Sequence, residues 1–244
     1  MQIYGDGPVK LLVVECDADL HLRATAKLRD DAVIAGDAKL PELVNISGHG
    51  RFVITLDPKD KLPGQQAYQG IVPLDGDTIA AVIEHYMLRS EQLDTRLWLA
   101  ADDQVSRGLL LQKLPGLETV DAAEEGELDT WRRSIMLAST LKDEELLATD
   151  SATLMQRLFW EETIRVLEPK HPQFRCSCHR EKVGNMLKML GQREIDEAIA
   201  ELGKLEVDCD FCGKRYEFDK VDCAHLFATQ AHVATIFPAS EKRH

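Results

Sequence analysis

The sequence lacks any long apolar run. No stretch approaches the about 18 consecutive apolar residues that a membrane-spanning helix needs. The start of the chain also lacks the basic residues and the small-residue cleavage site of a secretory signal. We therefore expect the protein to reside in the cytoplasm, where thiols stay reduced. In that compartment, paired cysteines indicate metal binding or redox chemistry before structural disulfides.

An excess of basic residues is also missing. The 244 residues include 42 Asp and Glu against 29 Lys and Arg, which gives a net charge of -13. Proteins that bind nucleic acids neutralise phosphates with clustered Lys and Arg, so this composition disfavours a nucleic-acid partner. The acidity is uneven: residues 1–175 carry a net charge of -11, and residues 176–244 carry -2.

Residues 1–120 combine strand patterns with one clear helical pattern. The helix follows Asp77, its expected N-cap, and shows apolar residues at helical spacing from Ile79 to Met87. Pro115-Gly116 is expected to close this region. The β-rich runs are Pro8–Cys16, Gly50–Leu56, Tyr68–Leu74, Leu97–Ala101 and Gly108–Leu114. The fold class predicted for the chain is α+β, with an N-terminal β-sheet core domain and packed helices.

Residues 121–172 have few strand formers and are predicted to form a helical linker. Helices are expected over residues 128–141, directly after Lys142, and over residues 152–160. The apolar residues that need a cover are Trp131, Ile135, Met136, Leu154, Leu158 and Phe159. Periodicity leaves two interpretations open: an ordinary helical subdomain, or a connecting segment that packs its apolar stripe on a neighbour and can release it.

Residues 173–244 are predicted to form a small zinc-binding module. Cys176 and Cys178 form a CxC pair, and after 30 intervening residues Cys209 and Cys212 form a CxxC pair at the turn of a predicted hairpin. Gly213 can take the positive φ that such a turn requires. Four thiolates brought together make a tetrahedral site that suits one Zn²⁺. A helical stretch over residues 182–202 and a last helix over about residues 221–232 complete the module.

The cysteine pattern permits more than one role. A structural zinc staple is the commonest role of four such cysteines, and four sulfurs leave no open position for a catalytic zinc, so no enzyme activity is predicted. Each pair is also close enough in sequence to form its own disulfide, which would remove zinc and unfold the module. A zinc ribbon that binds nucleic acid or a protein remains an alternative. Cys16 is expected to be a buried apolar side chain, and Cys223 to pack within the last helix.

The segments around these cysteines resemble the heat-shock protein 33 family of redox-regulated holdase chaperones. The resemblance covers almost the whole chain. Two departures stand out: the usual segment ahead of GDGP is missing, which indicates a truncated form or a misassigned start, and Arg107 stands where small residues are usual. The matching segments are GDGP, GQQAYQGIVPL, HYMLRSEQ, GLLLQKLPG, LFWEETIRVLEPKHPQFRCSCHREKV and VDCDFCGKRYEFDKVD.

The resemblance implies an ATP-independent chaperone of the oxidative stress response. While reduced, it would hold one zinc ion on Cys176, Cys178, Cys209 and Cys212 and be inactive. Oxidation would form the disulfides Cys176–Cys178 and Cys209–Cys212, release zinc and unfold the linker. The active form would bind unfolding client proteins and tend to form a homodimer, with no nucleic-acid or membrane partner.

Overall fold

The computed structural model describes residues 1–62, 64–114 and 122–234, and it has the predicted α+β class. The chain divides into two compact units. The first contains residues 1–13 and 26–170, and the second contains residues 14–25 and 171–244. Within the described ranges, no helix has the length and apolar character needed to cross a membrane. The predicted closure at Pro115-Gly116 lies outside the described residues.

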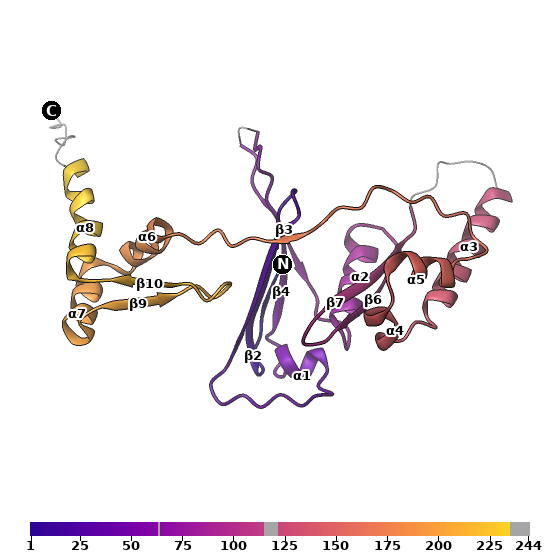
Figure 1. Cartoon of the computed structure of the whole chain (residues 1–244), viewed down its shortest axis with the longest axis horizontal. Helices are drawn as coiled ribbons and strands as arrows, with labels where there is room; N and C mark the ends of the chain where they lie inside the picture. The colour runs from indigo at the N-terminus through magenta and orange to yellow at the C-terminus, as the bar shows by residue number, and fades with distance from the viewer. Residues whose placement is uncertain (63, 115–121, 235–244) are drawn as a thin grey trace, which may run out of the picture. The chain divides into compact units, whose positions relative to one another are not determined.

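The first unit is built on an antiparallel sheet (Figure 1). Strand β1 pairs with both β2 and β4, and β4 pairs with β5, in the order β5-β4-β1-β2-β3. The strands are β1 Gln2–Tyr4, β2 Val9–Cys16, β3 His21–Leu28, β4 Arg51–Leu56 and β5 Tyr68–Val72. The three strands predicted in this region are confirmed. Strands β1 and β3 were not predicted, because β1 has three residues and β3 contains two alanines and a lysine, residue types that are depleted in strands.

Two helices cover the core of this sheet, α1 (Leu40–Val44) and α2 (Ile79–Ser90). Val82 and Tyr86 of α2 are buried there, as the predicted apolar stripe requires. The prediction of Asp77 as the N-cap was wrong. The hydroxyl of Thr78 accepts the N–H of Ala81 at 3.1 Å instead. Asp77 forms an ion pair with Lys39 at 2.5 Å, so its carboxylate is used elsewhere.

A second sheet in the same unit carries the helices of the predicted linker. Strands β6 (Thr95–Ala101) and β7 (Ser106–Gln112) form an antiparallel hairpin. Helices α3 (Ala122–Ala138), α4 (Asp143–Ala148) and α5 (Ser151–Leu158) lie beside it (Figure 1). Their shared core consists of Ala100, Ala138, Leu146, Leu154, Leu158 and Phe159, with Trp98, Leu109 and Leu111 of the hairpin packed against it. The apolar stripe therefore has a cover, except at Met136, which is 64% exposed.

The second unit contains the predicted C-terminal module. Its hairpin and last helix are confirmed. The predicted helical stretch from residue 182 to 202 is two helices, because Gly191 has φ +97 and ends the first of them. The elements are β8 Gln173–Phe174, α6 Arg180–Leu190, α7 Gln192–Leu202, β9 Leu205–Asp208, β10 Arg215–Phe218 and α8 Lys220–Ala234. Their core includes Leu187, Ile195, Ile199, Tyr216, Phe218 and Cys223.

The tip of the β2–β3 hairpin, residues 14–25, also belongs to the second unit. Strand β8 adds to β3 in parallel, with Leu22 opposite Phe174. The N–H of Arg175 donates to the carbonyl of Leu22 at 3.1 Å. This pairing brings the segment that enters Cys176 alongside β3.

Candidate metal centre

The four predicted cysteines come from two segments of the second unit. Cys176 and Cys178 lie between β8 and α6, and Cys209 and Cys212 lie in the turn between β9 and β10. Gly213 has φ +69, as predicted, and its N–H donates to the carbonyl of Cys209 at 2.8 Å. This tight turn directs both sulfurs of the CxxC pair to one side.

The structure brings all four sulfurs together. They lie within 4.8 Å of one another. The Sγ atoms of Cys176 and Cys209 are 3.6 Å apart, and those of Cys178 and Cys212 are 3.4 Å apart. A tetrahedral zinc with Zn–S bonds of about 2.3 Å requires sulfurs about 3.8 Å apart. The spacing and the donor type of the cluster therefore fit one zinc ion.

Hydrogen bonds among the thiols shift the pKa values of Cys176 and Cys212 in opposite directions. Burial acts to raise the pKa of Cys176, but hydrogen bonds from the Cys178 backbone and from the other thiols lower that pKa to about 6. The backbone N–H of Lys214 acts to lower the pKa of Cys212, yet its hydrogen bonds to Cys178 and the other thiols raise that pKa to about 12. A bound cation would replace the protons of these thiols, since it compensates the charge of the thiolates.

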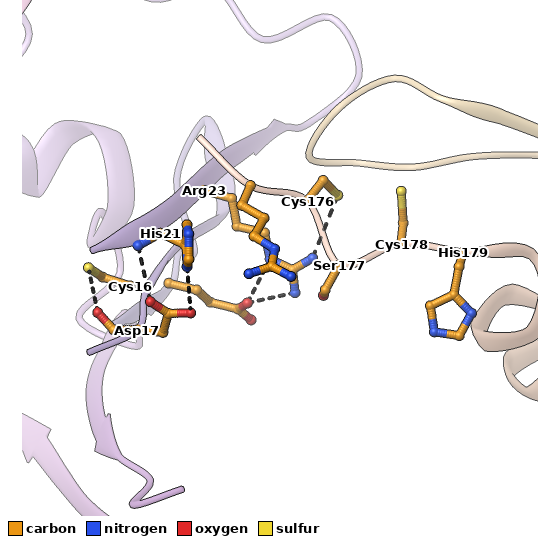
Figure 2. A pocket seen from close by; sticks show the side chains of 10 residues that line it. Cys16, Asp17, His21, Arg23, Cys176, Ser177, Cys178 and His179 are labelled. Atoms are coloured by element: carbon orange, nitrogen blue, oxygen red, sulfur yellow. Dashed lines mark hydrogen bonds and ion pairs between the residues drawn. The ribbon is translucent and has the colours of Figure 1, made fainter. Parts of the chain in front are cut away.

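Two further side chains contact the sulfurs. The hydroxyl of Tyr216 donates to Cys178 Sγ at 3.1 Å. The guanidinium of Arg23 donates to Cys176 Sγ at 3.7 Å, as Figure 2 shows. The sequence analysis missed both. The predicted alternation of β10 could have indicated Tyr216, because it faces the same side as Phe218. Arg23 is 153 residues from Cys176 and carries no local signal.

His179 does not join the cluster as a ligand. It is the N-cap of α6, and its Nδ1 accepts the N–H of Lys182 at 3.3 Å. Figure 2 shows its ring turned away from Cys176. Its omission from the predicted ligand set agrees with this placement.

The two remaining cysteines differ in their surroundings. Cys223 is 2% exposed in the core of the second unit, as predicted. The prediction that Cys16 is buried was wrong: it is exposed at the end of β2, where the strand turns toward β3. Within the described residues, one other group could hold a cation, formed by Asp17, Asp19 and His21 next to Cys16. Asp17 and His21 line a hollow together with Cys176 and Cys178 (Figure 2).

Comparisons with known proteins agree on one family. The profile of the family described as Hsp33 protein matches residues 1–219. A 33 kDa chaperonin of Methylobacillus flagellatus is 45% identical over 244 residues, covering 100% of this chain and 77% of that relative. The 33 kDa chaperonins of Chromobacterium violaceum and Pseudomonas fluorescens are 44% and 40% identical, each also over 100% of this chain and 77% of the relative.

A solved structure supports the fold. The crystal structure of the 33 kDa chaperonin (heat shock protein 33 homolog) from Thermotoga maritima aligns with a TM-score of 0.72 at 21% identity. The alignment covers 95% of this chain and 77% of that one. With a family profile over most of its length and relatives above 40% identity, the chain belongs to the Hsp33 protein family of chaperones.

Proposed function

We propose that this protein is a cytoplasmic, redox-regulated and ATP-independent holdase, a binding protein rather than an enzyme. It would bind unfolding proteins during oxidative stress and prevent their aggregation. The observation that carries the proposal is the cluster of four sulfurs within 4.8 Å of one another in a chain of a chaperone family. Such a cluster can hold a metal while reduced and lose it when oxidised.

In the reduced state, the ligands would be Cys176, Cys178, Cys209 and Cys212. Zinc, when bound, would hold all four as thiolates and link the segment before α6 to the β9–β10 turn. Tyr216 would orient Cys178 through its hydroxyl, 3.1 Å from the sulfur. Cys178 and Cys209 also pack against the core of this unit, so the cluster and the core support each other.

Hydrogen peroxide would supply the oxidising equivalents. One thiolate of a pair attacks a peroxide oxygen, the O–O bond breaks, and a sulfenic acid forms as hydroxide leaves. The second thiolate attacks that sulfur, the S–S bond forms, and a second hydroxide leaves. Each pair thus loses two electrons to one peroxide molecule, which becomes two water molecules after protonation. Every disulfide withdraws two of the four ligands.

We propose Cys176–Cys178 and Cys209–Cys212 as the disulfide pairs. The sulfurs of Cys176 and Cys209 also lie 3.6 Å apart, so a cross-pair is within reach. A cross-pair would fasten the two halves of the module together and keep it closed. A disulfide within each pair leaves the two halves free to separate, which a switch requires. Peptide mapping of the oxidised protein distinguishes the two patterns.

The segment that responds would be the linker, residues 121–172. Its helices α3 to α5 cover the β6–β7 hairpin with a continuous apolar face. When that face is released, both the helices and the hairpin expose apolar side chains. Such a surface binds non-native chains through the same burial that drives folding. The oxidised form would then dimerise through part of this surface.

The test is to treat the reduced protein with hydrogen peroxide at mildly elevated temperature. Zinc release is followed with a chromophoric chelator, and light scattering follows the aggregation of a denatured test protein. We expect zinc release, loss of four free thiols and suppression of aggregation, together with dimers by sedimentation. Cys16→Ser is the matched control and should behave as the wild type, because Cys16 lies outside the cluster. If zinc leaves and aggregation continues, the chaperone proposal is wrong.

The zinc-ribbon alternative has less support. Lys204 forms ion pairs with Glu206 and Glu217, and Arg215 forms ion pairs with Glu206 and Asp208. The hairpin therefore presents paired charges rather than a basic face for phosphates. A salt-sensitive binding curve of the reduced protein with DNA or RNA would favour that alternative instead.

A further inference from the structure

Arg23 on β3 contacts both halves of the cysteine cluster. Its side chain is 12% exposed. One guanidinium nitrogen lies 3.7 Å from the sulfur of Cys176, in the CxC half. The guanidinium carbon lies 4.0 Å from the ring centre of Phe211, which stands between the cysteines of the CxxC half. All three residues belong to the second unit, so these contacts lie within one compact body.

The guanidinium is held in place by a third partner. Glu15, on the neighbouring strand β2, forms an ion pair with Arg23 at 2.6 Å. The planar fork of an arginine can donate to a carboxylate on one edge and to a sulfur on the other while its face stacks on a ring. A lysine has one compact charge and cannot make all three contacts at once. The arrangement therefore uses properties specific to arginine.

We propose that Arg23 is a positioning residue that restrains the oxidation of the cysteine cluster by binding Cys176. This inference rests on the proposed zinc site. Four thiolates on one zinc ion leave the cluster with a net charge of about -2, and a cation in contact with one sulfur draws electron density from it. A less electron-rich sulfur attacks peroxide more slowly.

The same contact ties the cluster to the β2–β3 hairpin tip. A thiolate accepts a charge-assisted hydrogen bond from Arg23, but a disulfide sulfur carries no charge and accepts only weakly. Oxidation of Cys176 therefore removes the attraction between its sulfur and the guanidinium, while the contacts of Arg23 with Glu15 and Phe211 remain. The hairpin tip, which pairs with β8 just ahead of Cys176, would lose a restraint in the same step.

The direct test compares rates of zinc release under peroxide. A charged hydrogen bond changes an equilibrium constant by about 10-fold to 150-fold. The logarithm of the rate constant of nucleophilic attack changes by about half as much. We expect Arg23→Gln to release zinc about three- to tenfold faster than the wild type. Arg193→Gln is the matched control: Arg193 is 87% exposed on α7 and pairs with Glu197 of the same helix. Its release rate should equal that of the wild type.

Further variants separate charge from packing. Arg23→Lys keeps the charge and should release zinc more slowly than Arg23→Gln. If the role of Arg23 is purely structural, the two variants should release zinc at the same rate. Phe211→Leu removes the ring beneath the guanidinium and should give an intermediate rate. With Co²⁺ in place of zinc, the sulfur-to-metal charge-transfer absorption of Arg23→Gln should shift, because the sulfur of Cys176 becomes a stronger donor. Circular dichroism verifies that each variant is folded.

The outcomes distinguish this inference from the proposed function. A wild-type protein that purifies without zinc overturns the metal site, and this inference with it. A wild type that binds zinc and releases it to peroxide, at the same rate as Arg23→Gln and with an unchanged cobalt spectrum, overturns the role of Arg23 alone. The proposed chaperone switch would then stand.

Discussion

Side chains that touch the cysteine sulfurs should influence how firmly the proposed site binds a metal. Tyr216 is 5% exposed, and its hydroxyl reaches Cys178 at 3.1 Å. Its ring also belongs to the core of the second unit. The ring and the hydroxyl thus make separable contacts: the ring packs in the core, and the hydroxyl would orient Cys178 as a ligand of the proposed metal site.

The substitution Tyr216→Phe tests that separation. It retains the ring and removes the O–H···S hydrogen bond, so the fold should persist while zinc affinity falls. Groups that orient metal ligands contribute about 10-fold to 100-fold in affinity, and we expect a loss at the lower end of that range. Competition with a chromophoric chelator measures it. Tyr4→Phe is the control, because Tyr4 is exposed and its hydroxyl donates to Gln2 of the same strand, away from the cysteines. Equal affinities for the two variants would contradict the role given to the hydroxyl.

Arg107 also acquires a role from its contacts. It lies on β7, and its guanidinium donates to the carbonyl of Thr149, the C-cap residue of α4. Carbonyls at a helix end lack partners within the helix, so this bond both caps α4 and fastens it to the hairpin. Arg107 is therefore one of the residues that hold the linker helices on the hairpin.

Arg107→Met keeps the aliphatic stem and removes this bond. We expect the helices α4 and α5 to open more easily, by about 1–3 kcal/mol, because a charged donor to a helix end is lost. Hydrogen exchange over residues 143–158 measures the opening. The control is Arg157→Met, which removes an exposed ion pair with Glu145 and should cost about 1 kcal/mol or less. If both variants exchange alike, Arg107 does not fasten the linker.

At the scale of elements, the linker helices owe their position to one apolar interface. Leu154 and Leu158 of α5 are 5% and 7% exposed against the β6–β7 hairpin. Helix α4 begins without a side-chain cap, and Asp150 caps α5 by accepting the N–H of Thr153 at 3.0 Å. Short helices of this kind are not stable alone, so burial against the hairpin is their main support.

Leu154→Ala should weaken that support. Truncating a buried leucine costs about 2–5 kcal/mol, and the cost falls on the docking of the linker. We expect the variant to suppress aggregation of a test protein at a lower peroxide dose than the wild type. Leu167→Ala is the matched control, since Leu167 is 71% exposed within the same linker. If hydrogen exchange shows that the linker of this variant opens, but the variant still requires the peroxide dose of the wild type, linker docking does not control activation.

The sequence predicted these elements well where a periodic apolar pattern coincided with burial. The stripe of α2 and the hairpin β9–β10 are examples, and the four cysteines were assigned to one cluster on spacing alone. The prediction failed where tertiary contacts, rather than the local sequence pattern, determine the structure. Strand β3 is held by its neighbours and not by an apolar run, and Gly191 interrupts a helical pattern that is otherwise continuous. The contact of Arg23 with Cys176 spans 153 residues, so only the folded chain could reveal it.

At the scale of the whole molecule, the two units have separate cores. The cluster around Phe52 and Val82 lies in the first unit, and the cluster around Leu187 and Phe218 lies in the second. No buried residue is shared between these clusters among the described residues. Loss of one core therefore need not disrupt the other. The second unit contains fewer residues than the first, and its core adjoins the four sulfurs. A bound metal should therefore contribute much of its stability.

Metal removal should accordingly affect the two units differently. We expect a chelator, added under reducing conditions so that no disulfide forms, to raise hydrogen exchange throughout α6, α7 and α8 while β4, β5 and α2 remain protected. Returning zinc should restore protection, because the thiols are still reduced. If α3 to α5 also open on chelation alone, loss of metal suffices to release the linker. If helices α3 to α5 stay protected until peroxide is added, disulfide formation is required in addition to the loss of zinc. The disulfides would then also prevent the second unit from refolding.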